Sequence, residues 1–418
     1  MIKGENKMNA QRNQYLTMYL GAAVLIAAGF LMGPPIESIK QLWILIKSQP
    51  ILLTDYFAIS SVGTALINSG LMMILVISIA RISKCEVNGI FIASTYIVGG
   101  FSLFGKNLYN VISIILGVYL YSLIKKEKFS KHAALANFGT SLAPLVSQVT
   151  FGMNLPPVLA LILANVCGLT IGFVLPPLAG NCASFHKGFS IYNGGFTTGF
   201  IGLVFMSLFR LLGYNHTSVS VLTDKTDIRL MVFLFAYFFL LIVTGYLYSR
   251  KSLKEYVRIL SYSGKPGTDF VALEGFGSAM VNMGVMGISA VAFALLCKAP
   301  LNGPVVGAIF TVVGFSALAN NLTNSVPVVI GIVLATLVGK GSMATTGAMI
   351  TALFATTLAP VAGHYGIIPG IMAGFLHVVL VSNLAYLHGW MNLYNNGFAG
   401  GFVAGIMVPL LEAFRKKK

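Results

Sequence analysis

The sequence predicts an all-α polytopic integral membrane protein made of two inverted repeats of about seven transmembrane segments each, some of them re-entrant or broken. Three observations lead to this fold class: an apolar composition, a motif that occurs twice, and basic loops that change places between the two copies. The first observation places the chain in a bilayer. The second divides the chain into halves, and the third orients these halves relative to each other.

The composition is that of a membrane protein. Of the 418 residues, 56% are hydrophobic and only 9% are charged, whereas soluble domains average about 25% charged residues. A helix needs about 20 apolar residues to cross a bilayer, and runs of this kind recur along the chain, for example at 15–33 and 230–248. Too few charged side chains remain to cover a surface that faces water.

A motif of histidine, tyrosine, asparagine and glycine occurs twice. The stretch HKGFSIYNGGFTTGF begins at His186 and HGWMNLYNNGFAGGF begins at His388, an offset of 388 − 186 = 202. Upstream, further pairs align at an offset of 214, which places Asp55 on Asp269. Self-similarity at a nearly fixed period indicates duplication. It predicts a first membrane repeat at 1–215, a polar linker at 216–226 and a second membrane repeat at 227–418.

Each half contains seven apolar segments at corresponding positions, and runs of this length indicate membrane helices. In the first half they are expected at 15–33, 61–80, 88–104, 108–124, 133–151, 155–178 and 189–212. In the second half they are expected at 230–248, 275–297, 301–318, 322–339, 344–362, 366–386 and 391–412.

Two kinds of segment depart from a simple membrane helix. The pieces at 37–49 and 251–263, between the first and second segments of each half, are amphipathic, which is typical of helices that lie at the membrane surface. The fifth and seventh segments of each half are rich in glycine, threonine and serine. We expect these segments to be re-entrant or broken.

Basic residues are distributed differently around the two copies. After the fourth segment, the first copy has four lysines within 125–131, whereas the second has Lys340 alone. After the first segment the bias reverses, with five basic residues within 250–265 against Lys40 and Lys47. Positive loops mark the cytoplasmic side, so we expect inverted copies in a bacterial cytoplasmic (inner) membrane with both termini cytoplasmic. A parallel repeat stays open as the alternative.

Polar residues that recur inside the apolar segments are candidates for a solute pathway, because polar groups in hydrocarbon are costly unless they face protein or water. Asn68 and Asn282 lie in the second segments at equivalent positions. An amide offers two donors and an acceptor, which suits a polar solute or an ion. The same side chains could instead join helices by hydrogen bonds, and the sequence leaves both roles open.

Asp55 and Asp269 are the only acidic residues that are preserved in both copies. One interpretation is a carboxylate that binds a proton or a cation and couples transport to an ion gradient. Thr-Asp before an apolar run is also typical of a helix N-cap, and the sequence favours this second role.

The duplicated motif is a further candidate for the pathway. Its Asn-Gly backbone could unwind a helix and point amides and carbonyls at a solute, and histidine can relay protons because its pKa lies near neutrality. Alternatively, histidine and tyrosine anchor the seventh segment at the membrane surface. The pathway residues that the motif predicts are His186, Tyr192, Asn193, His388, Tyr394 and Asn395.

Familiar catalytic and ligand-binding motifs are missing from the sequence. It contains no GxxxxGK[ST], HExxH or GxSxG, and its four cysteines have no CxxC pair or regular spacing. We therefore expect no enzyme activity, no cofactor and no metal site. The net charge of +16 resides in clusters beside apolar segments, so a nucleic acid is not an expected partner. The expected partners are a small polar solute and lipid, and a homo-oligomer is compatible with the sequence.

The full-length duplication and the paired stretches YNGGFTTGF/YNNGFAGGF and TDYF/TDFV resemble the bacterial multi-pass membrane family known as domain of unknown function 1576. The resemblance covers essentially the whole chain and implies a repeated membrane module, with no assigned substrate or site residue. IYNGGFTTGFIG is also similar to a stretch of urea transporters, which implies a small neutral solute. The second copy departs from that stretch at Asn396, and the Leu-Pro-Thr signature of urea transporters is missing.

Together these features predict an inverted-repeat permease or channel for a small polar solute. The first alternative is a proton- or sodium-coupled secondary transporter that uses Asp55 and Asp269. A membrane-embedded enzyme with His186 and His388 as acid–base groups, or a scaffold, is the alternative from a different class.

Overall fold

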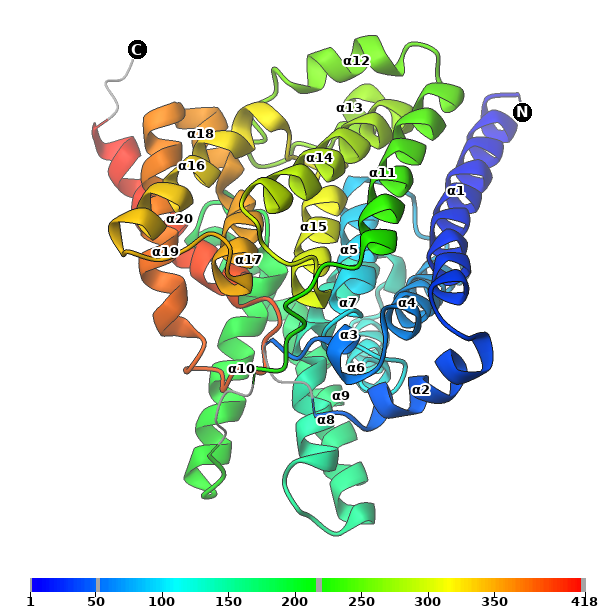
Figure 1. The fold of residues 1–418 in the computed structure, drawn as a ribbon, viewed down its shortest axis with the longest axis vertical. Helices are drawn as coiled ribbons and strands as arrows, with labels where there is room; N and C mark the ends of the chain where they lie inside the picture. The colour runs from blue at the N-terminus through cyan, green and yellow to red at the C-terminus, as the bar shows by residue number, and fades with distance from the viewer. Residues whose placement is uncertain (1, 50–52, 216–219, 415–418) are drawn as a thin grey trace.

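The computed structural model describes residues 2–49, 53–215 and 220–414, with side chains from residue 8 onward (Figure 1). Within these ranges the chain forms helices and no strand, and an isolated β-bridge joins Thr54 to Val221. Nine of the described helical segments are long and apolar enough to cross a membrane, and four more apolar helices are shorter. The protein is therefore all-helical and of the membrane type, as the composition predicts.

The helices of the first half follow the predicted segments in order. They are α1 (Ile2–Met32), α2 (Pro35–Lys47), α3 (Tyr56–Ile59), α4 (Val62–Ile82), α5 (Gly89–Phe101), α6 (Ile112–Ile124), α7 (Ala133–Gly139), α8 (Ala143–Phe151), α9 (Pro157–Phe185) and α10 (Asn193–Leu211). Two 3₁₀ turns, η1 (Phe129–Lys131) and η2 (Thr140–Leu142), precede and follow α7.

The second half repeats this order of helices. They are α11 (Ile228–Tyr248), α12 (Ser252–Ile259), α13 (Phe270–Glu274), α14 (Phe276–Leu296), α15 (Gly303–Phe315), α16 (Leu322–Val338), α17 (Thr346–Phe354), α18 (Ala359–Tyr365), α19 (Ile367–Leu384) and α20 (Asn395–Phe414). The 3₁₀ turn η3 (Ala355–Leu358) separates α17 from α18.

The predicted interruptions are correct for the fifth segment of each half and wrong for the seventh. In the fifth segments, η2 and η3 break the helix at corresponding places. In the seventh, α10 and α20 are continuous, and their glycines serve close packing instead. A Cβ atom at Gly199 would lie 2.1 Å from the Phe398 ring, and one at Gly401 would lie 2.1 Å from the Phe196 ring.

Pairs of glycines set the distance between the outer helices. Where α1 crosses α4, a Cβ atom on Gly29 would lie 2.6 Å from the carbonyl oxygen of Gly63. Gly245 and Gly277 form the corresponding contact between α11 and α14, at 2.4 Å. Small residues allow backbones to approach closely where lipid removes the hydrophobic driving force between helices. The two halves therefore use the same crossing.

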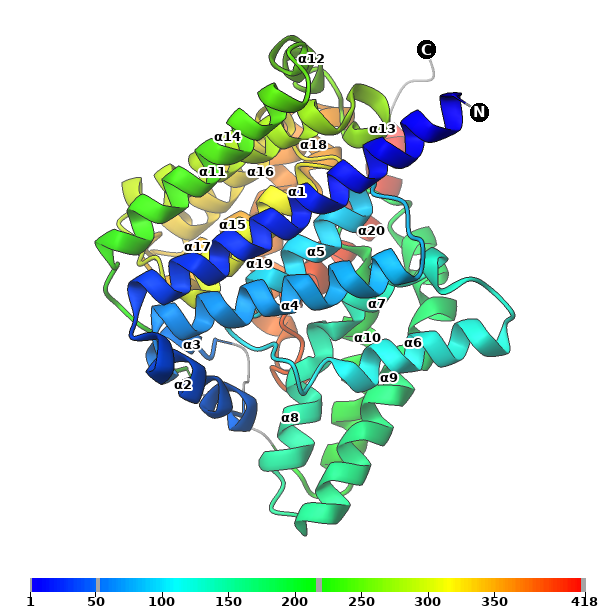
Figure 2. The same ribbon diagram turned by 90° about the vertical axis from the view of Figure 1, so that its right-hand side faces the viewer.

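The helices α1 and α11 run in opposite directions. The Tyr248 hydroxyl at the end of α11 donates to the carbonyl of Ala10 near the start of α1, at 3.4 Å. Figures 1 and 2 show α12 at the end of the molecule where α1 begins, and α2 toward the opposite end. The amphipathic helices of the two halves thus lie at opposite ends.

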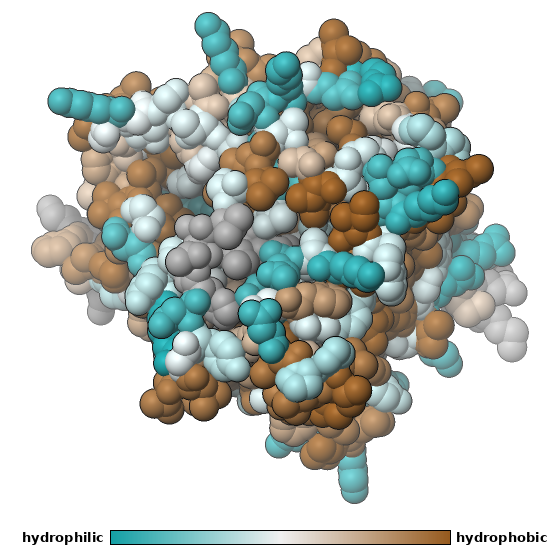
Figure 3. Space-filling view, turned by 60° about the horizontal axis from the view of Figure 1, so that its bottom comes forward, coloured by the Kyte–Doolittle hydropathy of each residue, from teal (hydrophilic) through white to brown (hydrophobic). Residues whose placement is uncertain are grey.

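Much of the outer surface is apolar. On α9, for example, Val158, Leu161, Ile162 and Val166 are exposed. On the face turned toward the viewer in Figure 3, hydrophobic residues are exposed among hydrophilic ones. Lipid would cover such side chains in a bilayer.

Candidate functional site

The helices α5 and α15 cross each other near the centre of the view in Figure 1. We call them half-helices because each is too short to span a bilayer. A Cβ atom on Gly100 would lie 2.6 Å from the carbonyl oxygen of Gly307, so only glycine permits this approach. Each helix has 13 residues, or about 20 Å at 1.5 Å per residue, which is less than the roughly 30 Å hydrocarbon core. Their last carbonyl groups therefore need partners within the protein.

The turns after the helices supply these partners, and Asn68 and Asn282 hold the turns in place. The Asn68 amide nitrogen donates to the carbonyl oxygens of Ser102 and Lys106, at 2.7 and 2.8 Å. The Asn282 nitrogen donates to the two equivalent carbonyls after α15, both at 2.7 Å. The amide nitrogens thus join helices by hydrogen bonds, one of the two roles that the sequence leaves open. The oxygen of Asn282 is buried without a partner.

Asp55 and Asp269 cap helices of the opposite half. Asp55 Oδ1 accepts hydrogen bonds from the N–H groups of Phe57 and of Gly303 at the start of α15, both at 2.9 Å. Asp269 accepts from the N–H of Gly89 at the start of α5, at 3.0 Å to Oδ2. Burial raises the pKa of Asp55, and its backbone hydrogen bonds act in the opposite direction. Both carboxylates occupy the N-cap position that the sequence favours, at the starts of α3 and α13, and their second contact, to the first N–H of α15 or α5, ties the two halves together.

The histidines of the duplicated motif fix the starts of α10 and α20. Nε2 of His186 lies 3.0 Å from Asn193 Oδ1, and Nε2 of His388 lies 2.9 Å from Asn395 Oδ1. Each Nδ1 accepts a backbone N–H at 3.4 Å, which assigns the neutral Nε2–H tautomer. The asparagines then donate to a carbonyl near the end of the preceding helix, at 2.9 and 3.2 Å. Both histidines are buried inside the protein.

The tyrosines of the motif meet between the two halves. The ring centroids of Tyr192 and Tyr394 are 4.8 Å apart, and the Tyr192 ring lies 4.3 Å from that of Phe315. The Tyr192 hydroxyl is hydrogen-bonded to Thr356 in η3 at 3.1 Å, whereas the Tyr394 hydroxyl is buried without a partner. The motif therefore forms an aromatic centre that is similar, but not identical, on its two sides.

Each broken helix is held by the chain that precedes α10 or α20 of the other half. The N–H of Ile191 donates to the carbonyl of Thr357 in η3, at 3.1 Å. In the same way, the N–H of Leu393 donates to the carbonyl of Ser141 in η2, at 3.0 Å. The irregular backbone is thus buried against the opposite repeat, as the absence of water in a bilayer core requires.

A cavity of about 500 Å³ with several polar side chains in its walls lies beside the motif of the second half. Its walls come mostly from α16, α17, α19 and the start of α20, and Leu53 of the first half and Ser220 of the linker also line it. No charged side chain is among its lining residues, and its polar side chains include Thr336, Thr351, Ser382, Asn395 and Asn396. Small-molecule sites typically measure about 300–1,000 Å³. Of the predicted pathway residues, Asn395 lines this cavity.

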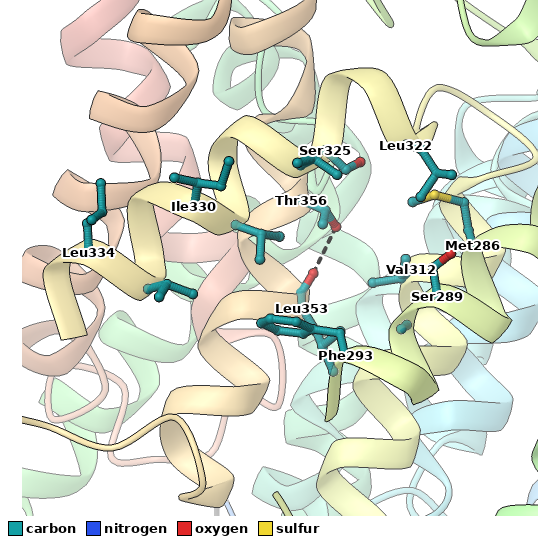
Figure 4. A pocket seen from close by; sticks show the side chains of 14 residues that line it. Met286, Ser289, Phe293, Val312, Leu322, Ser325, Ile330, Leu334, Leu353 and Thr356 are labelled. Carbon is teal, nitrogen blue, oxygen red and sulfur yellow. Dashed lines mark hydrogen bonds between the residues drawn. The ribbon is translucent and has the colours of Figure 1, made fainter. Parts of the chain in front are cut away.

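A second cavity, of about 340 Å³, is almost entirely apolar (Figure 4). It lies between α14, α15, α16 and α17, and its rim includes the exposed side chains of Ile330 and Leu334. The hydroxyl of Thr356 faces it but donates to the carbonyl of Leu353 at 2.8 Å. This cavity suits an alkyl chain rather than a polar solute.

The predicted pathway residues do not form a single site. Asn68 and Asn282 hold the ends of α5 and α15, whereas the histidines, tyrosines and asparagines of the motif surround the starts of α10 and α20. In the part of the chain that the structure describes, no group of three or more His, Cys, Asp or Glu residues is placed to hold a metal ion.

Lys106 is a buried residue that the sequence comparison passed over. Its Nζ lies 3.4 Å from the carbonyl oxygen of Asn137 and 4.9 Å from the centroid of the Phe101 ring. The aligned residue of the second half is Asn320, since 320 − 106 = 214. The signal was present in the aligned stretches GGFSLFGKNLYN and VGFSALANNLTN, because the first stretch contains one charged residue and the second contains none.

One protein family matches most of the chain, at residues 34–211 and 248–413, and it is described as a protein of unknown function, DUF1576. The chain belongs to this family. The two matched stretches coincide with the two halves, so the family module is the unit that occurs twice. No curated protein and no solved structure matches the chain, and the similarity to urea transporters stays a prediction.

Proposed function

We propose that the protein is an inverted-repeat permease or channel that moves a small, uncharged polar solute across the bacterial cytoplasmic membrane. The observation that carries this proposal is the cavity beside Asn395, which has hydroxyl and amide groups on its walls and no charged side chain. Such walls match the donors and acceptors of a neutral solute. An organic ion would instead require a counter-charge at this depth.

The proposal includes inverted repeats with alternating access. It is supported by the opposite directions of α1 and α11, by the opposite ends occupied by α2 and α12, and by the broken helix in each half. Most of the residues that line the cavity belong to the second half. In the first half, Tyr121 stands at the position of the cavity residue Ala335 and packs against His132 and Phe173. The side chain at this position therefore differs between the halves, and alternating access would open the equivalent places of the two halves in turn.

The inversion is tested with a matched pair of cysteines. Lys40 on α2 and its counterpart Lys254 on α12 (254 − 40 = 214) are both exposed, whereas the neighbouring Ser38 and Ser252 are buried and unsuited to labelling. The native cysteines are first replaced by serine. We expect a membrane-impermeant maleimide to label Lys40→Cys on intact cells, and Lys254→Cys only after the membrane is opened. Labelling of both from the same side would contradict the inversion.

Transport is tested by the flux of urea, glycerol and acetamide into proteoliposomes, and by blocking the cavity. A Cβ atom on Gly347, in the cavity wall, meets no atom within 4 Å, so a side chain can start there without a clash and Gly347→Trp should obstruct the cavity. We expect flux to fall by about tenfold or more, which is at least 1.4 kcal/mol in the barrier.

Gly180 on α9 is the control for the blocked cavity, because its Cβ position is equally open and it does not line the cavity. Gly180→Trp should transport like the wild-type protein. Equal flux in the two variants, or no flux of any tested neutral solute through the wild-type protein, would argue against the proposed function.

A further inference from the structure

The turns after α5 and α15 have the same backbone and different side chains. The N–H groups of Lys106 and Asn320 donate to the carbonyls of Phe101 and Phe315, at 3.0 and 3.1 Å. An asparagine of the neighbouring long helix holds each turn in the same way. Positions 106 and 320 are therefore equivalent in structure as well as in sequence.

A positive charge is favoured at these turns, because the carboxyl end of a helix carries a negative partial charge. In the first half the amine of Lys106 lies at this turn. Lys106 is the only buried lysine or arginine among the side chains that the structure describes, and none of the described carboxylates pairs with it. Its Nζ lies instead beside the Asn137 carbonyl oxygen and over the face of the Phe101 ring. Both the carbonyl oxygen and the ring face carry a partial negative charge.

The turn after α15 has no charged side chain, and three buried polar atoms at this turn have no hydrogen-bond partner. Asn320 is fully buried, and neither its Oδ1 nor its Nδ2 has a hydrogen-bond partner. The Oδ1 of Asn282 is unpaired too, and the two residues are neighbours because the Asn282 nitrogen donates to the Asn320 carbonyl at 2.7 Å. Buried polar atoms are nearly always paired, so a group of unpaired ones points to a ligand-binding site.

We propose that the end of α15 binds a monovalent inorganic cation, such as sodium, through the side-chain oxygens of Asn282 and Asn320. Carbonyl oxygens at broken helix ends bind such ions in membrane transporters. A neutral ligand would satisfy the amides but would leave the negative end of α15 without a positive partner. The first half has a lysine amine at this turn, whereas the second half would take a cation from solution.

The consequence for transport, though not the site itself, rests on the proposed function: a cation bound at the end of α15 would couple uptake to a sodium gradient if its binding favours one of the two access states. The coupling group is then the pair of asparagines, rather than a carboxylate.

The test measures the melting temperature of the full-length protein in detergent against sodium chloride, with choline chloride holding the ionic strength constant. We expect a saturable rise with sodium in the wild-type protein. Asn320→Lys, which copies the first half, should lose this sodium response. Asn154→Lys, in an exposed loop, is the control for an added lysine and should respond like the wild-type protein.

Asn320→Leu keeps the size of the side chain without its oxygen, and it keeps the test valid if the lysine variant does not fold. We expect its apparent sodium affinity to fall by roughly tenfold or more, as the loss of one good ligand implies. A wild-type protein without any sodium response, or an Asn320→Leu variant with a full response, would overturn the proposal. Solute flux without sodium binding would overturn only the cation site, and sodium binding without any solute flux would overturn only transport.

Discussion

The two halves share their scaffold and differ at the groups that face the centre. Both have a broken fifth segment, a half-helix held by an asparagine, and an aspartate that caps the opposite half. They differ where Lys106 corresponds to Asn320, and where Tyr121 corresponds to Ala335, which lines the cavity beside Asn395. The comparison teaches that residues preserved in both copies hold the helices in place, whereas the residues that differ give equivalent places a different chemistry.

The largest effect is expected where the two halves are most alike, at the glycines between α6 and α9 and between α16 and α19. A Cβ atom at Gly172 would lie 2.0 Å from the Ile114 carbonyl oxygen, and one at Gly374 would lie 2.0 Å from that of Val328. Gly172→Val and Gly374→Val should each destabilise by about 3 kcal/mol or more, because overpacking forces the helices apart. Fluorescence-detected size exclusion and thermal melting would measure this, with Gly180→Val as a neutral control. If only one of the two valine variants kept its stability, the two helix crossings would not be equivalent.

A smaller and again equal loss is expected at the asparagines that hold the half-helices. Asn68→Leu and Asn282→Leu each remove two hydrogen bonds to carbonyls, which is worth about 1–3 kcal/mol. The two variants should melt at similar temperatures in choline chloride. Only Asn282→Leu should weaken the sodium response. An equal loss of that response in both variants would contradict a cation site that belongs to the second half alone.

The histidines should show a structural effect of similar size in both halves. His186→Gln and His388→Gln break the contact that fixes the start of α10 or α20, and we expect a loss of about 1–2 kcal/mol from each. Thermal melting and solute flux should be measured on the same samples. Loss of a turnover activity in His388→Gln at unchanged stability would instead favour the membrane-embedded enzyme.

The smallest effect is expected at the aspartates. Asp55→Asn keeps an oxygen that accepts from Phe57 and Gly303 and loses the acceptor for Thr223, so the cost should be about 1 kcal/mol or less. Asp269→Asn should cost no more, since it is less buried. Flux through both variants should stay near the wild-type rate. Abolished flux in Asp55→Asn would identify a coupling carboxylate instead of a cap.

Much of the scaffold could be predicted from the sequence. The apolar segments, the amphipathic helices α2 and α12 and the breaks at η2 and η3 follow from composition and duplication. The seventh segments could not be predicted, because glycine in a sequence indicates either a break or a close contact. Only the partner helix distinguishes these, as the rings of Phe398 and Phe196 do against Gly199 and Gly401.

By itself, the sequence determined that the protein is an all-helical membrane protein, that it contains one module twice, and which polar residues the copies share. Only the tertiary structure decided what those residues do. Asp55 caps a helix that begins 248 residues later. The difference between Lys106 and Asn320 became meaningful because the structure buries both side chains at equivalent helix ends. The physical reason is that packing between the two halves, and not sequence neighbours, selects the partner of a buried polar group.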